Sequence, residues 1–486
     1  MIARLPELVH LPADSRAGWQ AAAGVEFHHV TADSRAARYG SLFVAVPGTQ
    51  SDGRAYIADA VARGACAVLA PLGTVWPPGV PPRPLITDPE PRRRLAQIAA
   101  DMAGPLPAIL AAVTGTNGKT STVDFLRQIW ALAGHQAASL GTLGVISPAG
   151  RCHGAMTTPD PVVLAQALAG LKRAGVERAA LEASSHGLDQ CRLDGLRISA
   201  AAWTNLTRDH LDYHGDMAAY RQAKLGLFRT RLAAQGWAVA STTLEAESLQ
   251  ALQDVARKRR LVLRLVGEGG DWIRLLAATP TPHGQVVVLE SEGRRHEVPL
   301  SLPGRFQADN VLVAAALAQG SGVADPWDLL PRLVGVRGRM ELAASLRGAA
   351  VFVDYAHTPD ALERLLAALR PHASGRLLAV FGAGGDRDRG KRPLMGAVCA
   401  RMADLAIVTD DNPRSEDPAA IRAAVLAGCP GGIDGGERRA AIAMALEMLR
   451  PGDVLAVAGK GHEDGQTIAG VKYPFDDVAV VRELAS

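Results

Sequence analysis

The chain is poor in cysteine, and its few cysteines are dispersed. They stand at positions 66, 152, 191, 399 and 429, and no two have the spacing CxxC. An odd number without close pairs argues against a disulfide framework and against a structural zinc site. This cysteine usage is typical of a protein from a reducing compartment.

Long apolar runs are also missing. A membrane-spanning helix needs about 18 or more consecutive apolar residues, and no stretch of the sequence approaches that length. The opening MIARLPELVH has no apolar region of the kind found in a signal peptide. We therefore expect a cytoplasmic protein that does not insert into a membrane.

The chain has little net charge, with 52 Lys and Arg against 49 Asp and Glu, a formal charge of +3. Such a balance gives no general attraction to nucleic acid. The basic run RKRR at 257–260 follows a helical pattern, so we interpret it as a solvated helix end. We expect small-molecule partners and no nucleic acid.

What is present is enough for two to four globular domains, since the 486 residues are 48% apolar and 21% charged. The first segment, 1–104, has strand-like runs at 41–46 and 66–70 and a helix at 92–102, with a Pro-rich insertion at 76–84. The run AGPLP at 103–107 marks its end.

The next two segments predict α/β structure. From 105 to 336, strand-like and helix-like stretches alternate, which is typical of a mostly parallel sheet covered by helices. The stretch 261–300 is more β-like and predicts antiparallel strands added to that sheet. From 337 to 486, the strands AAVFVDY, RLLAVFG, LAIVTDD and DVLAVAG each lead into a loop, and the first three also into a helix, which predicts a second α/β unit.

The loop TGTNGKTS at 114–121 follows an apolar strand and opens a helix. In such a loop the backbone N–H groups point at phosphates, Lys119 reaches the terminal phosphates and Thr120 can bind Mg²⁺. The strict GxxxxGK[ST] pattern fails by one position, because Val113 stands where the first glycine belongs. The strand before and the helix after still favour an ATP site over an ordinary capped turn.

Polar residues follow two further strands of this segment. Glu182 lies in LEASSHGLDQ and His210 in WTNLTRDHLDYHGD, and parallel strand ends converge on one edge of a sheet. A carboxylate there suits Mg²⁺, whereas histidine is a less natural ligand. Taken alone, each residue is better explained as a cap or a hydrogen-bonding loop residue. Lys224 in YRQAKLGLF is best interpreted from its pattern as a surface lysine with its stem on apolar neighbours.

The stretch DDNPR at 410–414 ends another strand. Asp and Asn side chains bond their own backbone and Pro413 fixes φ, so the pattern predicts a rigid turn. A rigid turn with both charges is also what a clamp for a zwitterionic ligand needs.

Seven motifs in order resemble the Mur ligase family over nearly the whole chain: TGTNGKTS, EASSHGL, NLTRDHLDYHG, DYAHTPDAL, GAGGDRDRGKRPLMG, DDNPR and AGKGHE. The resemblance implies three domains: a UDP-sugar-binding domain (1–104), a central ATP-binding domain (105–336) and a Rossmann-like amino-acid-binding domain (337–486). We expect a monomer. It also implies that ATP phosphorylates the D-glutamate carboxylate of UDP-N-acetylmuramoyl-L-alanyl-D-glutamate. The amine of meso-diaminopimelate then attacks the acyl phosphate, in peptidoglycan precursor synthesis.

The resemblance further implies residue roles. The catalytic residues are Lys119, Glu182, His210, Lys224, Arg339 and Asp354. Two Mg²⁺ ions are expected at Thr120, Glu182, His210 and Lys224, where Lys224 carries a carbamate formed with CO₂. ATP contacts are expected at Gly115, Thr116, Asn117, Gly118, Lys119, Thr120, Ser121, Asn310, Arg339 and Asp354. The UDP-linked substrate is expected at Ser34, Thr49, Gln50, Ser51, Thr157, Thr158, Ser184, Gln190 and Arg192. The amino acid is expected at Arg387, Asp411, Asn412, Pro413, Arg414, Gly459 and Glu463.

Two of these roles have a clear physical reason. Carbamate formation needs an unprotonated amine, against a free pKa of about 10.4, so a partly buried setting among Leu225, Leu227 and Phe228 would favour it. Diaminopimelate carries a distal carboxylate that lysine lacks, and Arg414 can bind it with two parallel hydrogen bonds. Asn412 and Glu463 are then expected to meet the distal amine.

Three positions depart from the family pattern, with Met156 where some relatives have Asn, Gln307 in place of an Asn, and Gly465 where Tyr is common. Other interpretations stay open. A folylpolyglutamate synthase-like ligase would share the phosphate loop and carbamate but would not need DNPR with GKGHE, and a lysine-adding relative would differ at the amino-acid site. A P-loop switch or regulatory ATPase would need only the loop and a partner surface. A kinase would release ADP without any amine.

Overall fold

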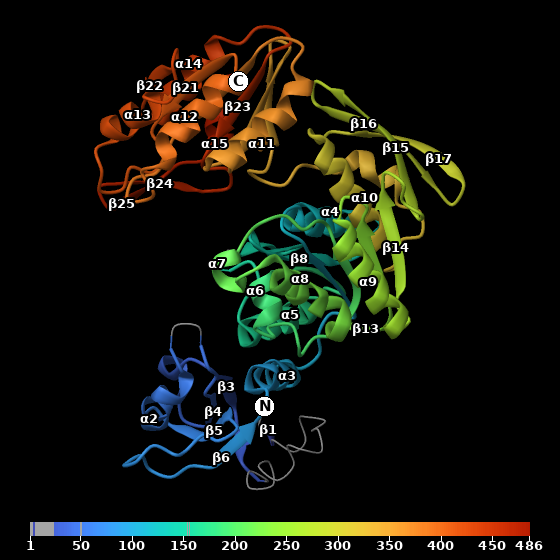
Figure 1. The fold of residues 1–486 in the computed structure, drawn as a ribbon, viewed down its shortest axis with the longest axis vertical. Helices are drawn as coiled ribbons and strands as arrows, with labels where there is room; N and C mark the ends of the chain where they lie inside the picture. The colour runs from blue at the N-terminus through green and yellow to red at the C-terminus, as the bar shows by residue number, and fades with distance from the viewer. Residues whose placement is uncertain (1–2, 5–23, 49–50, 153, 155) are drawn as a thin grey trace. The chain divides into compact units, whose positions relative to one another are not determined.

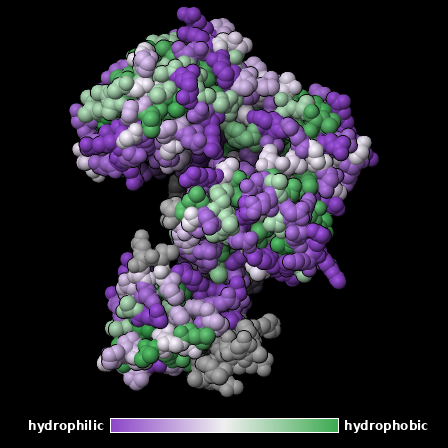
Figure 2. Space-filling view, viewed as in Figure 1, coloured by the Kyte–Doolittle hydropathy of each residue, from purple (hydrophilic) through white to green (hydrophobic). Residues whose placement is uncertain are grey.

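The computed structural model describes residues 3–4, 24–48, 51–152, 154 and 156–486. The chain forms two compact units, one made of Met1–Arg264 with Leu317–Ala324 and the other of Leu265–Ala316 with Asp325–Ser486. Figure 1 labels the helices and strands along the chain. Polar side chains cover much of the visible face, with apolar residues scattered among them (Figure 2). None of the described helices is both long enough and apolar enough to span a bilayer.

The first unit begins with a four-stranded parallel sheet in the order β3-β4-β5-β6. Its elements are β3 (His29–Thr31), η3 (Ser34–Ala36), β4 (Ser41–Val44), η4 (Gly53–Tyr56), α2 (Ile57–Ala62), β5 (Ala65–Pro71), β6 (Leu85–Asp88) and α3 (Pro91–Ala103). A short antiparallel pair, β1 (Ala3–Arg4) and β2 (Glu26–Phe27), precedes it. The predicted strands and the predicted helix are confirmed, and the insertion at 76–84 contains no helix or strand.

The same unit holds the part of the sheet that carries the phosphate loop. Its central strand β7 (Ile109–Thr114) pairs in parallel with β11 (Arg178–Glu182) on one side and β12 (Ile198–Trp203) on the other. Farther out lie β8 (Ala137–Gly141), β9 (Gly144–Ser147), β10 (Gly150–Cys152) and β13 (Leu232–Ser241). The helices are α4 (Lys119–Leu132), α5 (Pro161–Arg173), α6 (Ser185–Asp189), α7 (Leu211–His214), α8 (Met217–Gly226), the π-turn η5 (Leu227–Arg231) and α9 (Ala246–Arg259). The carboxyl ends of β7, β11 and β12 therefore lie side by side, as predicted.

The division between the units falls within β14 (Val262–Gly267). In the second unit, β15 (Ile273–Thr281), β16 (Gly284–Ser291) and β17 (Arg294–Leu300) form an antiparallel ladder. The predicted antiparallel patch is thus right for these three strands and wrong for β14, whose last two residues pair with β15 in parallel. The helix α10 (Arg305–Gln319) and the 3₁₀ turn η6 (Trp327–Arg332) follow.

The rest of the second unit is a six-stranded sheet in the order β18-β19-β23-β20-β21-β22. Its strands are β18 (Glu341–Leu346), β19 (Ala349–Asp354), β20 (Leu377–Phe381), β21 (Leu405–Thr409), β22 (Ile433–Gly436) and β23 (Val454–Ala458). Its helices are α11 (Pro359–Leu369), η7 (Arg370–His372), α12 (Lys391–Met402), α13 (Pro418–Leu426), α14 (Arg438–Glu447) and α15 (Asp477–Ala485), and β24 (Gly465–Ile468) forms a hairpin with β25 (Val471–Pro474).

Both faces of this sheet are buried. Phe352 and Phe381 belong to the core on one face, with α11, α12 and α13, whereas Val351 and Val380 belong to the core on the other, with α14 and α15. Because successive strand residues point to opposite faces, strands covered on both sides are apolar throughout, which is why the four central strands were predictable. The edge strands β18 and β22 were not predicted.

Candidate active site

The phosphate loop is held in shape by the strand end beside it. Thr116 N donates to the Asn205 carbonyl at 3.1 Å, and Asn117 N donates to Asn205 Oδ1 at 2.9 Å. Gly115 has φ 150°, and a Cβ there would lie 1.9 Å from Thr204 Oγ1, so the backbone packs as only glycine allows. The loop therefore presents the amino end of α4, which favours a bound phosphate.

Two lysine side chains share one backbone oxygen in this loop. Lys119 Nζ donates to the carbonyls of Gly115 at 2.9 Å and Thr116 at 2.8 Å. Lys224 Nζ donates to the same Gly115 carbonyl at 2.9 Å. The phosphate loop and α8, which are far apart in the sequence, thus meet at a single acceptor.

Lys224 is only 1% exposed, so the interpretation as a surface lysine is wrong. Its Nζ lies 4.4 Å from the centre of the Tyr220 ring. Burial is the main reason that the pKa of the Lys224 amine lies well below its ordinary value, and the nearby Lys119 charge lowers it further. The neutral amine, which is the form that reacts with CO₂, is therefore favoured.

Glu182 ends β11 and is 3% exposed. Its Oε1 accepts a hydrogen bond from Thr142 N at 2.8 Å, and a Cβ on Gly141 would lie 2.0 Å from that oxygen. Burial raises the pKa of the Glu182 carboxyl, whereas the charge of Lys119 and the hydroxyl of Thr120 lower it. The carboxylate thus lies close to the phosphate loop, in a setting that suits a bound cation.

His210 precedes α7 in the left-handed conformation, with φ 53°. Its Nε2 lies 3.3 Å from Asp209 Oδ2, and the charge of Asp209 also acts on Lys224. The ring of His210 meets that of His186 at 4.9 Å. Within the described part of the chain, no three His, Cys, Asp or Glu side chains gather as a ready metal site, so the metal roles of His210 and Lys224 stay predictions.

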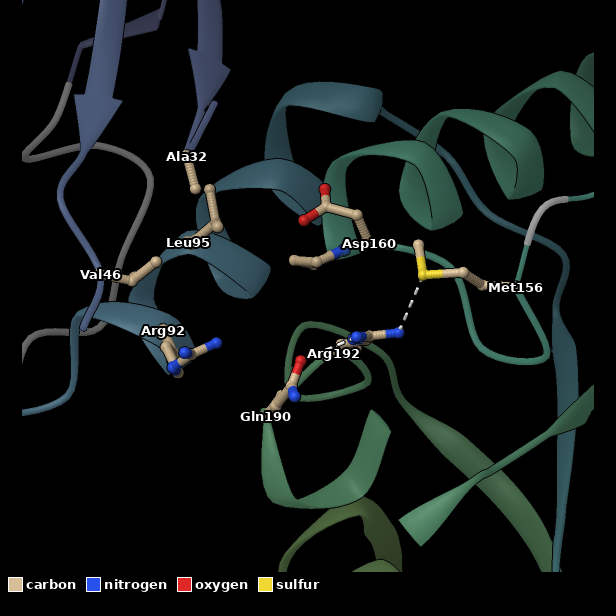
Figure 3. A pocket seen from close by; sticks show the side chains of 9 residues that line it. Ala32, Val46, Arg92, Leu95, Met156, Asp160, Gln190 and Arg192 are labelled. Carbon is tan, nitrogen blue, oxygen red and sulfur yellow. Dashed lines mark hydrogen bonds between the residues drawn. The ribbon is translucent and has the colours of Figure 1, made fainter. Parts of the chain in front are cut away.

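A cavity of about 120 Å³ lies within the first unit (Figure 3). It is lined by Ala32, Val46, Arg92, Leu95, Met156, Asp160, Pro161, Gln190 and Arg192. Arg192 Nη2 donates to Gln190 Oε1 at 2.7 Å, and its Nη1 lies 3.5 Å from the sulfur of Met156. Arg92 comes from α3, so two guanidinium groups from different segments face one cavity, which suits an anionic ligand.

The other residues predicted for the UDP-linked substrate lie in several places. Thr157 Oγ1 is 3.0 Å from Thr142 Oγ1, and Thr142 in turn binds Glu182. Thr158 Oγ1 donates to the Glu182 carbonyl at 2.8 Å, and Ser184 caps α6. Ser34 is buried at the start of η3 and Ser51 is exposed, whereas Thr49 and Gln50 lie outside the described residues.

In the second unit, the predicted turn DDNPR is also bonded to the hairpin β24–β25. Arg414 has φ 53°, its N donates to the Thr467 carbonyl at 3.0 Å and its carbonyl accepts from Ala469 N at 2.7 Å. Its Nη1 donates to the Gly385 carbonyl at 2.6 Å. Asn412 Nδ2 donates to Glu463 Oε2 at 2.9 Å, so these two predicted residues do meet.

Asp354 and Arg339 are two residues of this unit that were predicted to contact the nucleotide. The Asp354 carboxylate accepts hydrogen bonds from Met340 N and Ala356 N, each at 2.8 Å. Burial raises the pKa of Asp354 and the charge of Arg339 lowers it. The Arg339 guanidinium lies 5.0 Å from the centre of the Tyr355 ring.

The remaining predicted residues of this unit have contrasting settings. Asn310 on α10 donates to Gln307 Oε1 at 3.0 Å, so the departure at Gln307 keeps a polar partner for Asn310. Arg387 is exposed on the loop after β20, whereas Pro413 is buried. Gly459 has φ 121°, and a Cβ there would lie 2.5 Å from Asp411 Oδ2.

Three buried polar residues near DDNPR were missed by the sequence analysis. Lys460 and Arg438 are fully buried, and Gln466 Nε2 donates to the Asp411 carbonyl at 2.6 Å. The sequence could have indicated Lys460 as a candidate site residue, because it stands between two glycines in AGKGHE. Nothing local to Arg438 or Gln466 in the sequence indicates burial.

Three domain models match the chain in order: "Mur ligase family, catalytic domain" at 26–101, "Mur ligase middle domain" at 113–318 and "Mur ligase, glutamate ligase domain" at 338–461. The chain belongs to the Mur ligase family. Mur ligases are ATP-dependent enzymes that form amide bonds, and this decides against a P-loop switch, a regulatory ATPase or a simple kinase.

Among Mur ligases, the chain is similar to proteins named UDP-N-acetylmuramoyl-L-alanyl-D-glutamate–2,6-diaminopimelate ligase. The one from Caulobacter vibrioides is 53% identical over 464 residues, which cover 93% of each chain. The one from Agrobacterium fabrum is 50% identical over 461 residues, 94% of this chain and 93% of the relative. A solved structure with the same name has 33% identity and a TM-score of 0.75, covering 100% of this chain and 99% of the other.

More distant structures share the Mur ligase fold alone. The MurF ligase of Thermotoga maritima in complex with ADP has 19% identity and a TM-score of 0.58, covering 94% of this chain and 96% of that one. The Mycobacterium tuberculosis folylpolyglutamate synthase complexed with ADP has 19% identity and a TM-score of 0.59, covering 76% of this chain and 91% of that one. These likenesses confirm the predicted α/β architecture.

Proposed function

We propose that this Mur ligase joins meso-2,6-diaminopimelate to the D-glutamate carboxylate of UDP-N-acetylmuramoyl-L-alanyl-D-glutamate. ATP is converted to ADP and phosphate, and the reaction serves peptidoglycan precursor synthesis in the cytoplasm. The observation that carries the proposal is the 53% identity, over 93% of the chain, to the relative with that name. Segments 1–104, 105–336 and 337–486 then bind the UDP-linked substrate, ATP and the amino acid, acting as a monomer.

The chemistry follows from the poor reactivity of a carboxylate. A carboxylate oxygen of the D-glutamate attacks the γ-phosphorus of ATP, and ADP leaves. The amine of the amino acid then attacks the acyl carbon, and phosphate leaves as the C–N bond forms and the amine gives up a proton. Negative charge accumulates in both steps, so the N–H groups of the phosphate loop and the ammonium of Lys119 stabilise it.

The buried residues around Lys224 fit a carbamate and Mg²⁺. The neutral Lys224 amine bonds to the carbon of CO₂ and loses one proton, which turns a buried amine into an anionic oxygen donor. Thr120, Glu182, His210 and carbamylated Lys224 would hold two Mg²⁺ ions. When bound, these ions supply Lewis-acid stabilisation of phosphate charge. Support comes from the burial of Glu182 and Lys224, at 3% and 1% exposed.

The function is tested with the purified protein, ATP, Mg²⁺ and the UDP-linked dipeptide, adding either meso-diaminopimelate or lysine. We expect phosphate release to depend on the amino acid and to be faster with diaminopimelate, with a product heavier by one diaminopimelyl group. Faster turnover with lysine would overturn the amino-acid assignment. No turnover with either amino acid would overturn the proposed reaction itself.

Arg414→Ala is expected to lower the preference for diaminopimelate over lysine by roughly 10- to 100-fold, since a bidentate charged hydrogen bond contributes about 1.5–3 kcal/mol. Competition between the two amino acids, measured by product mass, reports this ratio. Arg401→Ala is the matched control, because its side chain is 59% exposed and pairs with Glu363 at the surface. An Arg414→Ala enzyme with the wild-type preference for diaminopimelate over lysine would show that Arg414 does not determine selectivity and serves only in the turn.

A further inference from the structure

Lys460 has a fully buried side chain, with 0% exposure. A buried ammonium is unfavourable unless it is hydrogen-bonded and paired with opposite charge. Its Nζ donates to Asn412 Oδ1 at 3.2 Å and to Glu463 Oε2 at 3.3 Å. Both partners belong to the proposed amino-acid site, so Lys460 contacts that site from its buried side.

The hydrogen bonds of Asn412 assign the orientation of its amide. Oδ1 accepts from Lys460 Nζ and from Thr467 N, the latter at 2.9 Å. Nδ2 donates to Asp411 Oδ1 at 3.0 Å and to Glu463 Oε2 at 2.9 Å. A flipped amide would set its oxygen against two carboxylates and its NH₂ group against two donors. Lys460 therefore supplies one of the two donors that fix this orientation.

Glu463 is anchored through one oxygen. Its Oε2 accepts from both Lys460 Nζ and Asn412 Nδ2. Among the described residues no side-chain hydrogen bond uses Oε1, and the side chain is 35% exposed. One oxygen is thus held inward, and the other is available to a ligand ammonium.

The charged groups next to Asp411 are only partly paired. Arg438 pairs with Asp477 at 2.7 Å, and its Nη1 lies 3.9 Å from Asp411 Oδ2. Within the described chain, neither of these last two atoms has a hydrogen-bond partner. Asp411 Oδ2 therefore keeps a hydrogen-bonding capacity that no described residue uses.

We propose that Lys460 is a positioning residue for the amino-acid site. It fixes the Asn412 amide and one oxygen of Glu463, and it sets the affinity for the amino acid without touching it. This inference rests on the proposed function, because that function assigns the site to the amino acid. In the motif AGKGHE, Lys460 then has a positioning role, whereas Gly459 and Glu463 are proposed to contact the amino acid.

The first test replaces the ammonium by a side chain of similar length, in Lys460→Met. We expect the KM for meso-diaminopimelate to rise about 10- to 100-fold, while the KM values for ATP and the UDP-linked dipeptide stay within about twofold. Lys472→Met is the matched control, since Lys472 is 63% exposed and pairs with Asp464 in the same unit. An unchanged KM for the amino acid, or an equal rise in all three KM values, would overturn the proposal.

A double-mutant cycle separates positioning from a general loss of packing. If Lys460 acts through Glu463, Lys460→Met has a smaller effect on the amino-acid KM in a Glu463→Gln background than in the wild type. Equal fold-changes in the two backgrounds would refute positioning through Glu463. Should Lys460→Met lack the wild-type circular dichroism spectrum, Lys460→Gln, which keeps an uncharged donor, takes its place under the same criteria.

The wild-type assay keeps the two proposals apart. A wild-type protein that uses neither diaminopimelate nor lysine contradicts the proposed function, and the inference on Lys460 falls with it. An active wild type with unaffected Lys460 variants contradicts the inference on Lys460 alone.

Discussion

Lys224→Met is expected to abolish ligation and, at the same time, to stabilise the fold. Without the carbamate, a cation ligand is lost at the site of phosphate transfer, and removing one such stabilising group lowers kcat by about 10²–10³-fold or more. The wild-type side chain is 1% exposed and keeps a polar amine there, whereas methionine is apolar and of similar length. We expect a gain of about 1–2 kcal/mol in the free energy of unfolding near pH 7.

The gain in the free energy of unfolding of Lys224→Met depends on pH, and its direction follows from the pKa of Lys224. The pKa of the Lys224 amine is lowered by folding, so between the folded and unfolded pKa values the unfolded wild-type chain binds a proton that the folded chain lacks. Wild-type stability therefore rises with pH across that window. The advantage of Lys224→Met should be full at the lower end of the window and should shrink toward pH values near the ordinary lysine pKa.

Thermal unfolding in CO₂-free buffer measures the stability, and phosphate release measures the activity. Lys258→Met, at an exposed position of α9, is the control for removing a lysine charge. In Lys224→Ala, bicarbonate should not restore activity, whereas short carboxylates that enter the space should restore a fraction. Full activity in either variant would exclude the carbamate, and an unchanged stability at every pH would contradict the lowered amine pKa.

Lys119→Met is expected to lower kcat/KM for ATP by roughly 10³-fold, through loss of the ammonium that neutralises charge on the transferred phosphate. The Lys119 ammonium now bonds to the carbonyls of Gly115 and Thr116, so it is already within the phosphate loop. Formation of ADP in a single turnover, without amino acid, isolates the first chemical step. Lys258→Met is again the control. A rate for Lys119→Met within tenfold of the wild type would show that Lys119 does not stabilise the first chemical step.

The convergence of the phosphate loop with Glu182 was predictable from the sequence, because parallel strands of similar length end at the same edge. The central strands β7, β11 and β12 are apolar and short, and each is followed by polar residues. The alternation of elements also predicted the covering helices, whereas the order of the strands in the sheet was not predicted. The same reasoning identified four of the six strands of the C-terminal sheet.

The burial of individual polar residues was not predictable. The local pattern around Lys224 is that of a surface helix, and its acceptor, the Gly115 carbonyl, stands 109 positions away. Arg438 is separated by 39 positions from its partner Asp477. Such pairs are decided by tertiary packing, which periodicity in a short window does not contain. The individual roles at the amino-acid site rested on the family resemblance, and they stay predictions.

For the proposed amino-acid site, the bonding of Arg414 to the β24–β25 hairpin has a consequence for how selectivity can change. Backbone bonds to Thr467 and Ala469 hold the DDNPR loop in place. Binding free energy is then not consumed in ordering a loop, so affinity depends on the side chains that the loop presents. Selectivity for a different amino acid can therefore arise by single side-chain substitutions, while the backbone of the loop stays unchanged.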